Sequence, residues 1–457
     1  MPEVIIIGAG PAGLTAAFKL KQKKIDVLVL EAQDLPGGNI KTISERGFLM
    51  ETGPHTFMGT NEFIFKLVDE LGLANSLEPA SPAANNRYIF RDGKLMPLPT
   101  GLVPFLKTPL LSAKAKMRLT LEPFIPNGAQ PMETAWEFFC RRFGEEAATY
   151  IMSPFISGIY AGNAKILGAR ASFPKFWNFE RESGSMILGA AKFMWRKNRR
   201  LAEEGVKPKK GLFSFKQGLG TLTSKLAQEL KGSVITGASA EKIYRQNGKF
   251  LVKTQSSEFS APVIIVATPP NKTADILGDF LPEVSANLKS IPMAPVALLH
   301  WSLAGNGFPA GFGFLMPRLY DLRVLGTLFP SQLFSNRAPQ GINLFASFYS
   351  GMLDPAAVNL SDEKLEKILI KEHKIIFGKD INAHEILKIL RYQAAIPQLL
   401  PDHPEKISAV LGELKKTPGL FLAGNYLTGV GLEHAVQNGY AAAAEVEKFL
   451  SVREEIK

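Results

Sequence analysis

Three glycines near the start of the chain have the spacing of a phosphate-binding turn. Gly8, Gly10 and Gly13 follow the apolar run from Val4 to Ile7 and open a segment with a helical pattern. In such a turn the first glycine permits the bend, the second lets the backbone approach a pyrophosphate, and the third lets the helix pack on the strand. The free N–H groups at the helix start also favour the negative phosphates. We therefore predict a dinucleotide site here.

An acidic residue lies where ribose recognition requires one. The run from Asp26 to Leu30 predicts a second strand, and Glu31 follows it, about 20 residues after the turn. A carboxylate at this place accepts both hydroxyl groups of an adenosine ribose and repels a 2′-phosphate. We therefore expect an adenine dinucleotide that lacks this phosphate.

Further segments predict additional parts of the same domain. Gly37 and Gly38 form a second glycine pair that brings more backbone close to a ligand, and Gly53 ends a short strand and turn. A helix with Leu222, Leu226 and Leu230 on one face precedes a strand at Val234, and a buried strand covers 262–268. Near the C-terminus, a strand over 419–423 leads through Gly424, Val430 and Gly431 into a helix over 433–450.

The order of these motifs resembles the FAD-binding half of the amine oxidase-like flavoprotein superfamily. The resemblance implies non-covalently bound FAD, with Val234 near the adenine. It implies that the C-terminal helix starts at the flavin, where its N–H groups would stabilise negative charge on the reduced ring. The cofactor residues implied are Gly8, Gly10, Gly13, Glu31, Gly37, Gly38, Gly53, Val234, Gly424, Val430 and Gly431.

The segments between the cofactor motifs resemble the protoporphyrinogen oxidase family within that superfamily. The blocks SGIYAG at 157–162 and GFGFLMP at 311–317 carry most of this resemblance, which covers essentially the whole chain. The family implies an arginine for a substrate propionate, two aliphatic residues around one pyrrole ring and an aromatic residue stacked on another. The matching positions are Arg87, Leu315, Leu328 and Phe348.

The resemblance implies oxidation of protoporphyrinogen IX to protoporphyrin IX, with hydride passing to the flavin and dioxygen reoxidising it. Coproporphyrinogen III, oxidised by the same chemistry, is the alternative substrate, and a non-catalytic carrier on the same scaffold is the alternative function. An amine substrate is disfavoured, because 294–299 lacks the lysine that amine oxidases carry there and Val430 replaces an aromatic cage residue. No residue is predicted as a catalytic acid or base.

We expect an α/β protein with three parts. A discontinuous Rossmann-like FAD domain comprises 1–84, 211–290 and 418–457; a largely helical substrate and membrane-facing domain comprises 85–210; and a substrate domain with a mixed sheet comprises 291–417. The length of 457 residues agrees with more than one core. The sequence leaves open whether the protein forms a homodimer.

The charge and residue composition of the chain limit the binding partners that we expect. A net charge of +11 favours anionic partners, of which an acidic small molecule and a membrane surface fit better than nucleic acid, which we do not expect. The single Cys140 and six scattered histidines predict no metal site. An apolar stretch with lysines over 98–119 and a basic loop over 192–210 are compatible with peripheral binding to the inner face of the cell membrane. A solvated linker is the alternative for the loop. We expect a cytoplasmic protein.

Overall fold

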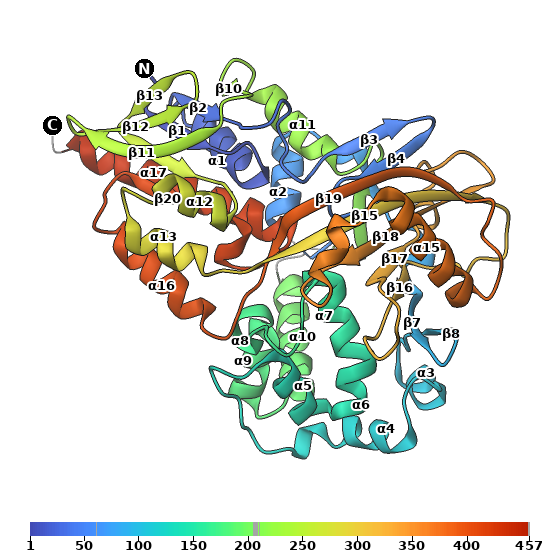
Figure 1. Cartoon of the computed structure of the whole chain (residues 1–457). Helices are drawn as coiled ribbons and strands as arrows, with labels where there is room; N and C mark the ends of the chain where they lie inside the picture. Colours follow the sequence, from blue (N-terminus) through green and yellow to red (C-terminus); the bar gives the residue numbers. More distant parts are fainter. Residues whose placement is uncertain (61, 204–208, 210, 456–457) are drawn as a thin grey trace.

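The computed structural model describes residues 1–60, 62–203, 209 and 211–455. One part of the molecule is built on a five-stranded sheet in which every neighbouring pair is parallel (Figure 1). In order across the sheet, its strands are β10 (Val234–Ile235), β2 (Val27–Leu30), β1 (Val4–Ile7), β14 (Val263–Val266) and β20 (Leu420–Leu422). Three separate parts of the chain thus contribute strands to one sheet.

Both faces of this sheet are covered, because its strands bury side chains on both sides. Val4 and Ile6 enter one apolar cluster, whereas Ile5 and Ile7 enter another. The first cluster involves helices α1 (Pro11–Gln22), α2 (Glu62–Glu70), α11 (Gly220–Glu229) and α17 (Leu432–Glu455). The second involves helices α12 (Pro270–Leu277), α13 (Pro282–Lys289) and α16 (His403–Leu414), and the antiparallel strands β11 (Ala240–Gln246), β12 (Lys249–Thr254) and β13 (Glu258–Ala261).

Two small antiparallel sheets lie between this part and the rest of the chain. One is the hairpin of β3 (Thr42–Glu45) and β4 (Phe48–Glu51). The other joins β9 (Leu212–Phe215) to β5 (Phe57–Met58) and β6 (Leu77–Pro79). Backbone of residues 211–220 thereby lies close to the N-terminal segment.

The second large sheet has seven strands and is mixed, because β16 pairs in parallel with β7 while the other pairs are antiparallel. In order, its strands are β19 (Glu385–Pro397), β15 (Met293–Ala304), β18 (Ile342–Ser350), β17 (Gly326–Leu328), β16 (Gly313–Leu315), β7 (Arg87–Arg91) and β8 (Lys94–Pro97). Helix α15 (Asp362–Phe377) packs on one face, and the short α14 (Pro330–Leu333) lies beside β18. An α/β fold with a mixed second sheet is thus confirmed.

Residues 98–203 form a group of helices below the two sheets in the view of Figure 1. They are α3 (Leu102–Lys107), α4 (Ala113–Thr120), α5 (Ala135–Phe143), α6 (Glu145–Ala147), α7 (Ser153–Tyr160), α8 (Ala169–Ser172), α9 (Pro174–Ser183) and α10 (Met186–Glu203). The sequence had grouped 85–97 with these helices, but β7 and β8 complete the seven-stranded sheet instead. Within the described residues no helix is long and apolar enough to cross a bilayer.

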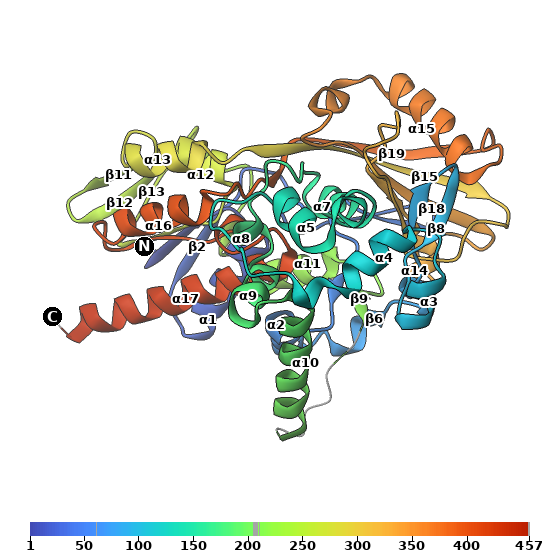
Figure 2. The same ribbon diagram turned by 90° about the horizontal axis from the view of Figure 1, so that it is seen from below.

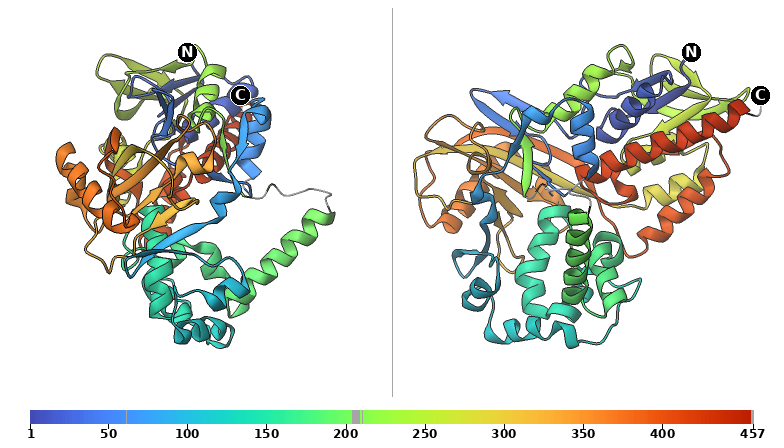
Figure 3. Two further views of the ribbon diagram at one scale, coloured as in Figure 1. Left: turned by 90° about the vertical axis from the view of Figure 1, so that its right-hand side faces the viewer. Right: turned by 180° about the vertical axis from the view of Figure 1, so that it is seen from behind.

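The predicted basic loop over 192–210 is wrong for residues 192–203, which continue helix α10. Residues 204–208 and 210 lie outside the described part of the chain. Figures 2 and 3 show α10 projecting from the body of the molecule. The run of positive charges was interpreted as a loop. The apolar residues in this segment nevertheless have the spacing of one helix face, at Ile187, Leu188, Met194 and Trp195.

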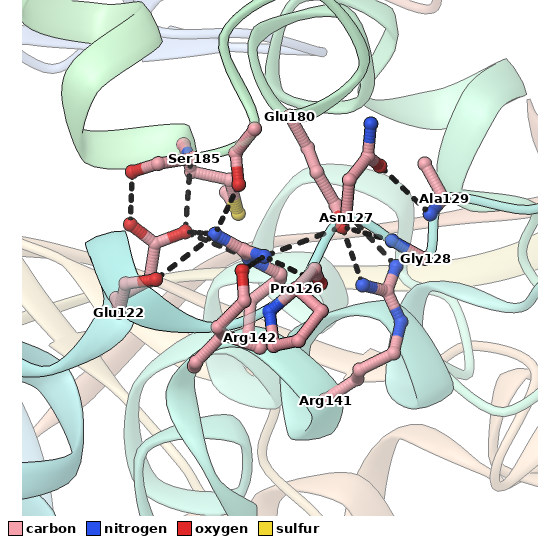
Figure 4. A network of polar contacts seen from close by, with 12 residues as sticks. Glu122, Pro126, Asn127, Gly128, Ala129, Arg141, Arg142, Glu180 and Ser185 are labelled. Carbon is pink, nitrogen blue, oxygen red and sulfur yellow. Dashed lines mark hydrogen bonds and ion pairs between the residues drawn. The ribbon is translucent and has the colours of Figure 1, made fainter.

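A buried group of charges fixes the base of α10 (Figure 4). The Glu122 carboxylate accepts hydrogen bonds from the Ser185 hydroxyl and the Met186 amide, at the N-terminus of the helix. Such a carboxylate also interacts favourably with the helix dipole. Arg142, which is fully buried, pairs with Glu122 and with Glu180. The guanidinium thereby joins α5, α9 and α10.

We predict that Arg142→Met destabilises the protein by about 3–5 kcal/mol, because Glu122 would be left as a buried charge without its cation, while Glu180 would keep only its ion pair with Arg141. Chemical denaturation measures this change. Arg199→Met is the matched control, since Arg199 pairs with Glu203 on an exposed part of α10. We expect it to change stability by less than about 0.5 kcal/mol. Equal effects of the two variants would contradict a structural role of the Arg142 ion pairs.

Candidate functional site

The predicted cofactor residues gather at one edge of the five-stranded sheet. All five strands are parallel, so their carboxyl ends lie at the same edge, where ligands bind in folds of this kind. Gly8 follows β1, Glu31 follows β2, and Gly424 lies just after β20. Val234 pairs with Val29 of β2, which places β10 beside Glu31. Their individual roles in binding stay predictions.

The glycine turn has the close contacts that its pattern predicts. Gly8 adopts a φ of 101°, which side-chain-bearing residues rarely adopt. A Cβ at Gly13 would lie 2.0 Å from the Gly8 carbonyl oxygen, so this glycine serves the packing of α1 on the turn. Gly10, by contrast, has no neighbour within 4 Å of its Cβ position. Gly10 therefore faces open space, and no side chain caps α1 there.

The glycine pair Gly37 and Gly38 packs against the glycine turn. A Cβ at Gly38 would lie 3.2 Å from the Cα of Gly10, and the Gly37 amide donates to the Ala9 carbonyl at 2.7 Å. Gly53 packs against the Asn39 carbonyl, 2.4 Å from its Cβ position. Backbone from three segments thus surrounds the start of α1, as a pyrophosphate site requires.

Glu31 is buried and supports the turn directly. Its carboxylate accepts the Ala9 amide at 2.7 Å and the Gln33 amide at 2.8 Å. A carboxylate has about four acceptor positions, so these two bonds leave capacity for ribose hydroxyl groups. The structure thus adds a second role for Glu31, which sequence spacing alone did not indicate: it holds the turn in shape.

Two asparagines fix the loop before α17. Asn438 donates to the Gly424 carbonyl at 2.7 Å and to the Thr428 hydroxyl at 3.0 Å, and Asn425 donates to the Val430 carbonyl at 3.0 Å. Gly431 then directly precedes the first residue of α17. No sequence pattern indicated Asn438, which lies inside the helix and donates hydrogen bonds back to the loop.

These features fit a flavin dinucleotide. The open side of Gly10, the uncapped start of α1 and the remaining acceptor capacity of Glu31 match a pyrophosphate and a ribose. Gly53 is a predicted cofactor contact, and the loop at Val430 and Gly431 is predicted to lie at the flavin ring. The bound flavin would supply hydride-accepting chemistry; the residues hold and orient it.

The four predicted substrate residues lie on one face of the seven-stranded sheet. Cross-strand partners share a face, as do residues two apart in a strand. Gly313 pairs with both Arg87 and Leu328, and Leu315 shares its row with Phe348 through Gly326. We call this the slot face, defined by Arg87, Leu315, Leu328 and Phe348. The three apolar members are each only partly buried, although their strand neighbours are buried.

Helix α7 crosses the slot face at Leu315. A Cβ at Gly158 would lie 2.6 Å from Leu315 Cδ2, so this glycine lets the helix approach the sheet. Arg87 lies at the other end of the face, in a small hollow that it shares with Asn85, Leu98 and Thr100. Its guanidinium lies 5.3 Å from the centre of the Phe312 ring and forms no ion pair with any residue that the structure describes.

The sequence analysis missed a buried group next to the slot face. His300 of β15 shares that face, because it pairs with Ala346, two residues from Phe348. Its Nε2 lies 2.9 Å from the Glu51 carbonyl, and burial raises the pKa of the Glu51 carboxyl to about 7. The ring of His55 lies 5.9 Å from that of His300. The one available signal was the place of His55, directly after the motif that contains Gly53.

Within the described residues, no three side chains of histidine, cysteine, aspartate or glutamate are arranged to hold a metal ion. Cys140 is a free thiol, and burial raises its pKa to about 11.

Comparison with known proteins agrees with this geometry. The family model described as "Flavin containing amine oxidoreductase" matches residues 11–447. The chain belongs to this family. A flavin cofactor and an oxidoreductase function, both expected from the sequence, are confirmed by this membership.

Individual members of the family match over nearly the whole chain. The chain is 32% identical to protoporphyrinogen oxidase 1, chloroplastic, of Arabidopsis thaliana, over 98% of this chain and 88% of the relative. It is 28% identical to coproporphyrinogen III oxidase of Bacillus subtilis (strain 168), over 98% of both chains. A crystal structure from Exiguobacterium sp. 255-15, provisionally assigned as a protoporphyrinogen oxidase, superimposes with a TM-score of 0.82 at 23% identity, covering 97% and 98% of the two chains.

Gly10 faces open space and Gly13 packs against backbone, so substitutions at the two positions should have different effects. Gly10→Ala should weaken FAD binding about tenfold or more without lowering apoprotein stability, because its Cβ enters the open space where backbone meets phosphate. Gly13→Ala should instead destabilise the apoprotein by about 1–3 kcal/mol, since its Cβ would overlap the Gly8 carbonyl. Calorimetric FAD titration and thermal unfolding separate the two effects. A Gly10 variant that retains FAD with unchanged affinity would place the pyrophosphate elsewhere.

Proposed function

We propose that this flavoprotein oxidises protoporphyrinogen IX to protoporphyrin IX, with dioxygen as the electron acceptor. The observation that carries the proposal is the slot face, where one unpaired guanidinium lies at the end of a row of partly buried apolar side chains. A porphyrinogen is a large apolar macrocycle with carboxylates at one edge, so it matches that distribution. The names of the relatives that match the whole chain support the same substrate class.

Each part of the slot face has a distinct task. Leu315, Leu328 and Phe348 contact the macrocycle and exclude water from the reacting carbon. Arg87 pairs with a propionate, for which its planar guanidinium is well suited. Asn85 and Thr100 in the same hollow add hydrogen-bonding groups for that carboxylate. The chain therefore binds and orients the substrate, and the bound flavin supplies the oxidising chemistry.

We propose the three domains expected from the sequence, except that β7 and β8, within 85–97, belong to the seven-stranded sheet. Segments 1–84, 211–290 and 418–457 would hold FAD, while 291–417 would provide most of the slot face. The segment 85–210 would contribute Arg87 and the helices that cover the slot. A non-catalytic carrier is disfavoured, because the glycines and the carboxylate of a working dinucleotide site are all present.

Coproporphyrinogen III is the second candidate substrate, favoured by the similarity to the Bacillus subtilis enzyme of that name. The two porphyrinogens differ in the number of carboxylates, since coproporphyrinogen carries propionates where protoporphyrinogen carries vinyl groups. Among the described residues Arg87 is a cation without an ion pair at the end of the slot face, and one such cation favours the less charged molecule.

Anaerobic mixing of the FAD-loaded protein with each porphyrinogen tests the function. We expect protoporphyrinogen to bleach the flavin absorbance faster than coproporphyrinogen does. Arg87→Met should raise KM about tenfold and change kcat less, because the ion pair is present in the ground and transition states alike. Lys94→Met, an exposed cation on the neighbouring strand β8, is the control. Absence of bleaching by either porphyrinogen would refute the function, and a strong preference for coproporphyrinogen would reverse the choice of substrate.

We further propose that the protein binds peripherally to an anionic membrane, because its substrate is poorly soluble. Helix α10 exposes a stripe of large apolar side chains, namely Ile187, Leu188, Met194 and Trp195. Basic residues flank this stripe, and Arg199 lies 5.8 Å from the centre of the Trp195 ring. On α3, Leu102, Val103 and Leu106 are also exposed. Apolar side chains flanked by positive charge are typical of interfacial helices.

We predict that Leu188→Asp with Trp195→Asp lowers binding to vesicles containing phosphatidylglycerol about tenfold or more, since two apolar groups would no longer enter the interface. Co-sedimentation measures the binding. Leu411→Asp on α16 is the control, because Leu411 is exposed to a similar extent, 43% against 50% for Leu188. Equal binding of all three proteins would favour a solvated helix instead.

A further inference from the structure

Two buried histidines beside the slot face have ring nitrogens without partners. His55 is only 5% exposed, and His300 is fully buried. Within the described residues, three ring nitrogens form no hydrogen bond: Nδ1 and Nε2 of His55, and Nδ1 of His300. The Gly53 carbonyl oxygen lies close enough to raise the pKa of His55, but this contact does not have the geometry of a hydrogen bond. Unpaired buried polar groups are costly, so a group outside the chain is expected to pair with them.

The place of His55 indicates what that group is. His55 follows Gly53, a predicted flavin contact, by two residues. Its ring lies edge-on to Phe348, with 6.1 Å between ring centroids, and Phe348 is a predicted substrate contact. His55 therefore lies where the cofactor-binding segment meets the slot face. A macrocycle stacked on Phe348 would present its pyrrole N–H groups in this region.

The protonation states follow from the surroundings. A carbonyl can only accept, so His300 donates Nε2–H to Glu51 and keeps a free lone pair on Nδ1. Burial lowers the pKa of His300 to about 4 and that of His55 well below 6.5. The other ionisable groups near the pair are Arg337, which lowers the pKa of His55, the carboxyl of Glu51, and Tyr392, whose hydroxyl donates to the Thr52 carbonyl. Both imidazoles are therefore neutral at pH 7.

We propose that His55 is the catalytic base that accepts the proton lost from a pyrrole N–H as the macrocycle gives up hydride. This inference rests on the proposed function and deepens it, since sequence reasoning named no proton acceptor. A neutral imidazole is the usual group for such a transfer.

The step balances in atoms and electrons. A C–H bond of a saturated bridging carbon breaks, and hydride carries two electrons to the flavin, which is the oxidant. The pyrrole N–H bond breaks, its electron pair helps to form the new conjugated double bond, and the proton forms an N–H bond on His55. Because burial makes His55 a weak base in this site, it releases the proton again to solvent before the next oxidation.

Variants at His55 test the proposal. His55→Gln and His55→Ala should lower the rate of flavin reduction about 100-fold or more. Added imidazole should restore part of the rate only in His55→Ala, which leaves space for it. Porphyrin product, titrated by fluorescence quenching, should bind His55→Ala about threefold to tenfold more weakly, because one hydrogen bond is lost. FAD content and the visible flavin spectrum should not change.

His373→Gln is the matched control. His373 is fully buried, and its Nε2 bonds to Thr327 and Ser347, which point away from the slot face of the same sheet. We expect this variant to lose stability but to show neither the rate loss nor rescue by imidazole. The control separates a general effect of removing a buried imidazole from the loss of a base.

A measurement on the unaltered protein keeps the proposal testable if the variants fold poorly. During anaerobic reduction, a pH-indicator dye should report proton release that lags behind flavin bleaching. Simultaneous release in the wild type, or full activity of His55→Gln, would overturn the proposal while leaving porphyrinogen oxidation intact. Failure of the wild type to react with any porphyrinogen would instead refute the proposed function.

Discussion

The two-residue alternation of strands β16, β17 and β18 is the constraint on which the slot depends. Phe314, Thr327 and Ser347 point to the side covered by α15, where they are buried. Leu315, Leu328 and Phe348 must then point to the opposite side. A slip of one residue in any of these strands would exchange the two faces, so the buried side fixes the register of the functional side.

Polar bonds on the buried side reinforce this register. His373 bonds to Thr327 at 2.8 Å and to Ser347 at 3.1 Å, and Trp301 donates to Ser347 at 2.9 Å. The short strand β17 is thereby held to β18 and to helix α15. Buried hydrogen bonds of this kind are costly to break, because each leaves an unpaired group behind. The face that contacts substrate is thus positioned by a network that does not touch it.

Much of the fold follows from local patterns. The four-residue run at β1, the buried leucines of α11 and the start of α17 within one residue of 433 were all predictable, because periodicity and glycine spacing are local properties. The prediction failed at α10, where the positive charges suggested a loop although the apolar residues repeat as in a helix. It also failed at β7, whose partner β16 lies more than 200 residues away in sequence, and at β8, which joins the sheet by pairing with β7.

The dinucleotide turn could be predicted from sequence spacing, because Gly8, Gly10, Gly13 and the carboxylate of Glu31 all act within one β–α–β unit. Resemblance supplied the substrate residues but not their arrangement. Folding places His55 against Phe348 and His300, and among the described residues it leaves both ring nitrogens of His55 and Nδ1 of His300 without partners. The reason is physical: spacing along the chain encodes local geometry, whereas burial and pairing of side chains depend on segments that meet only in the folded protein.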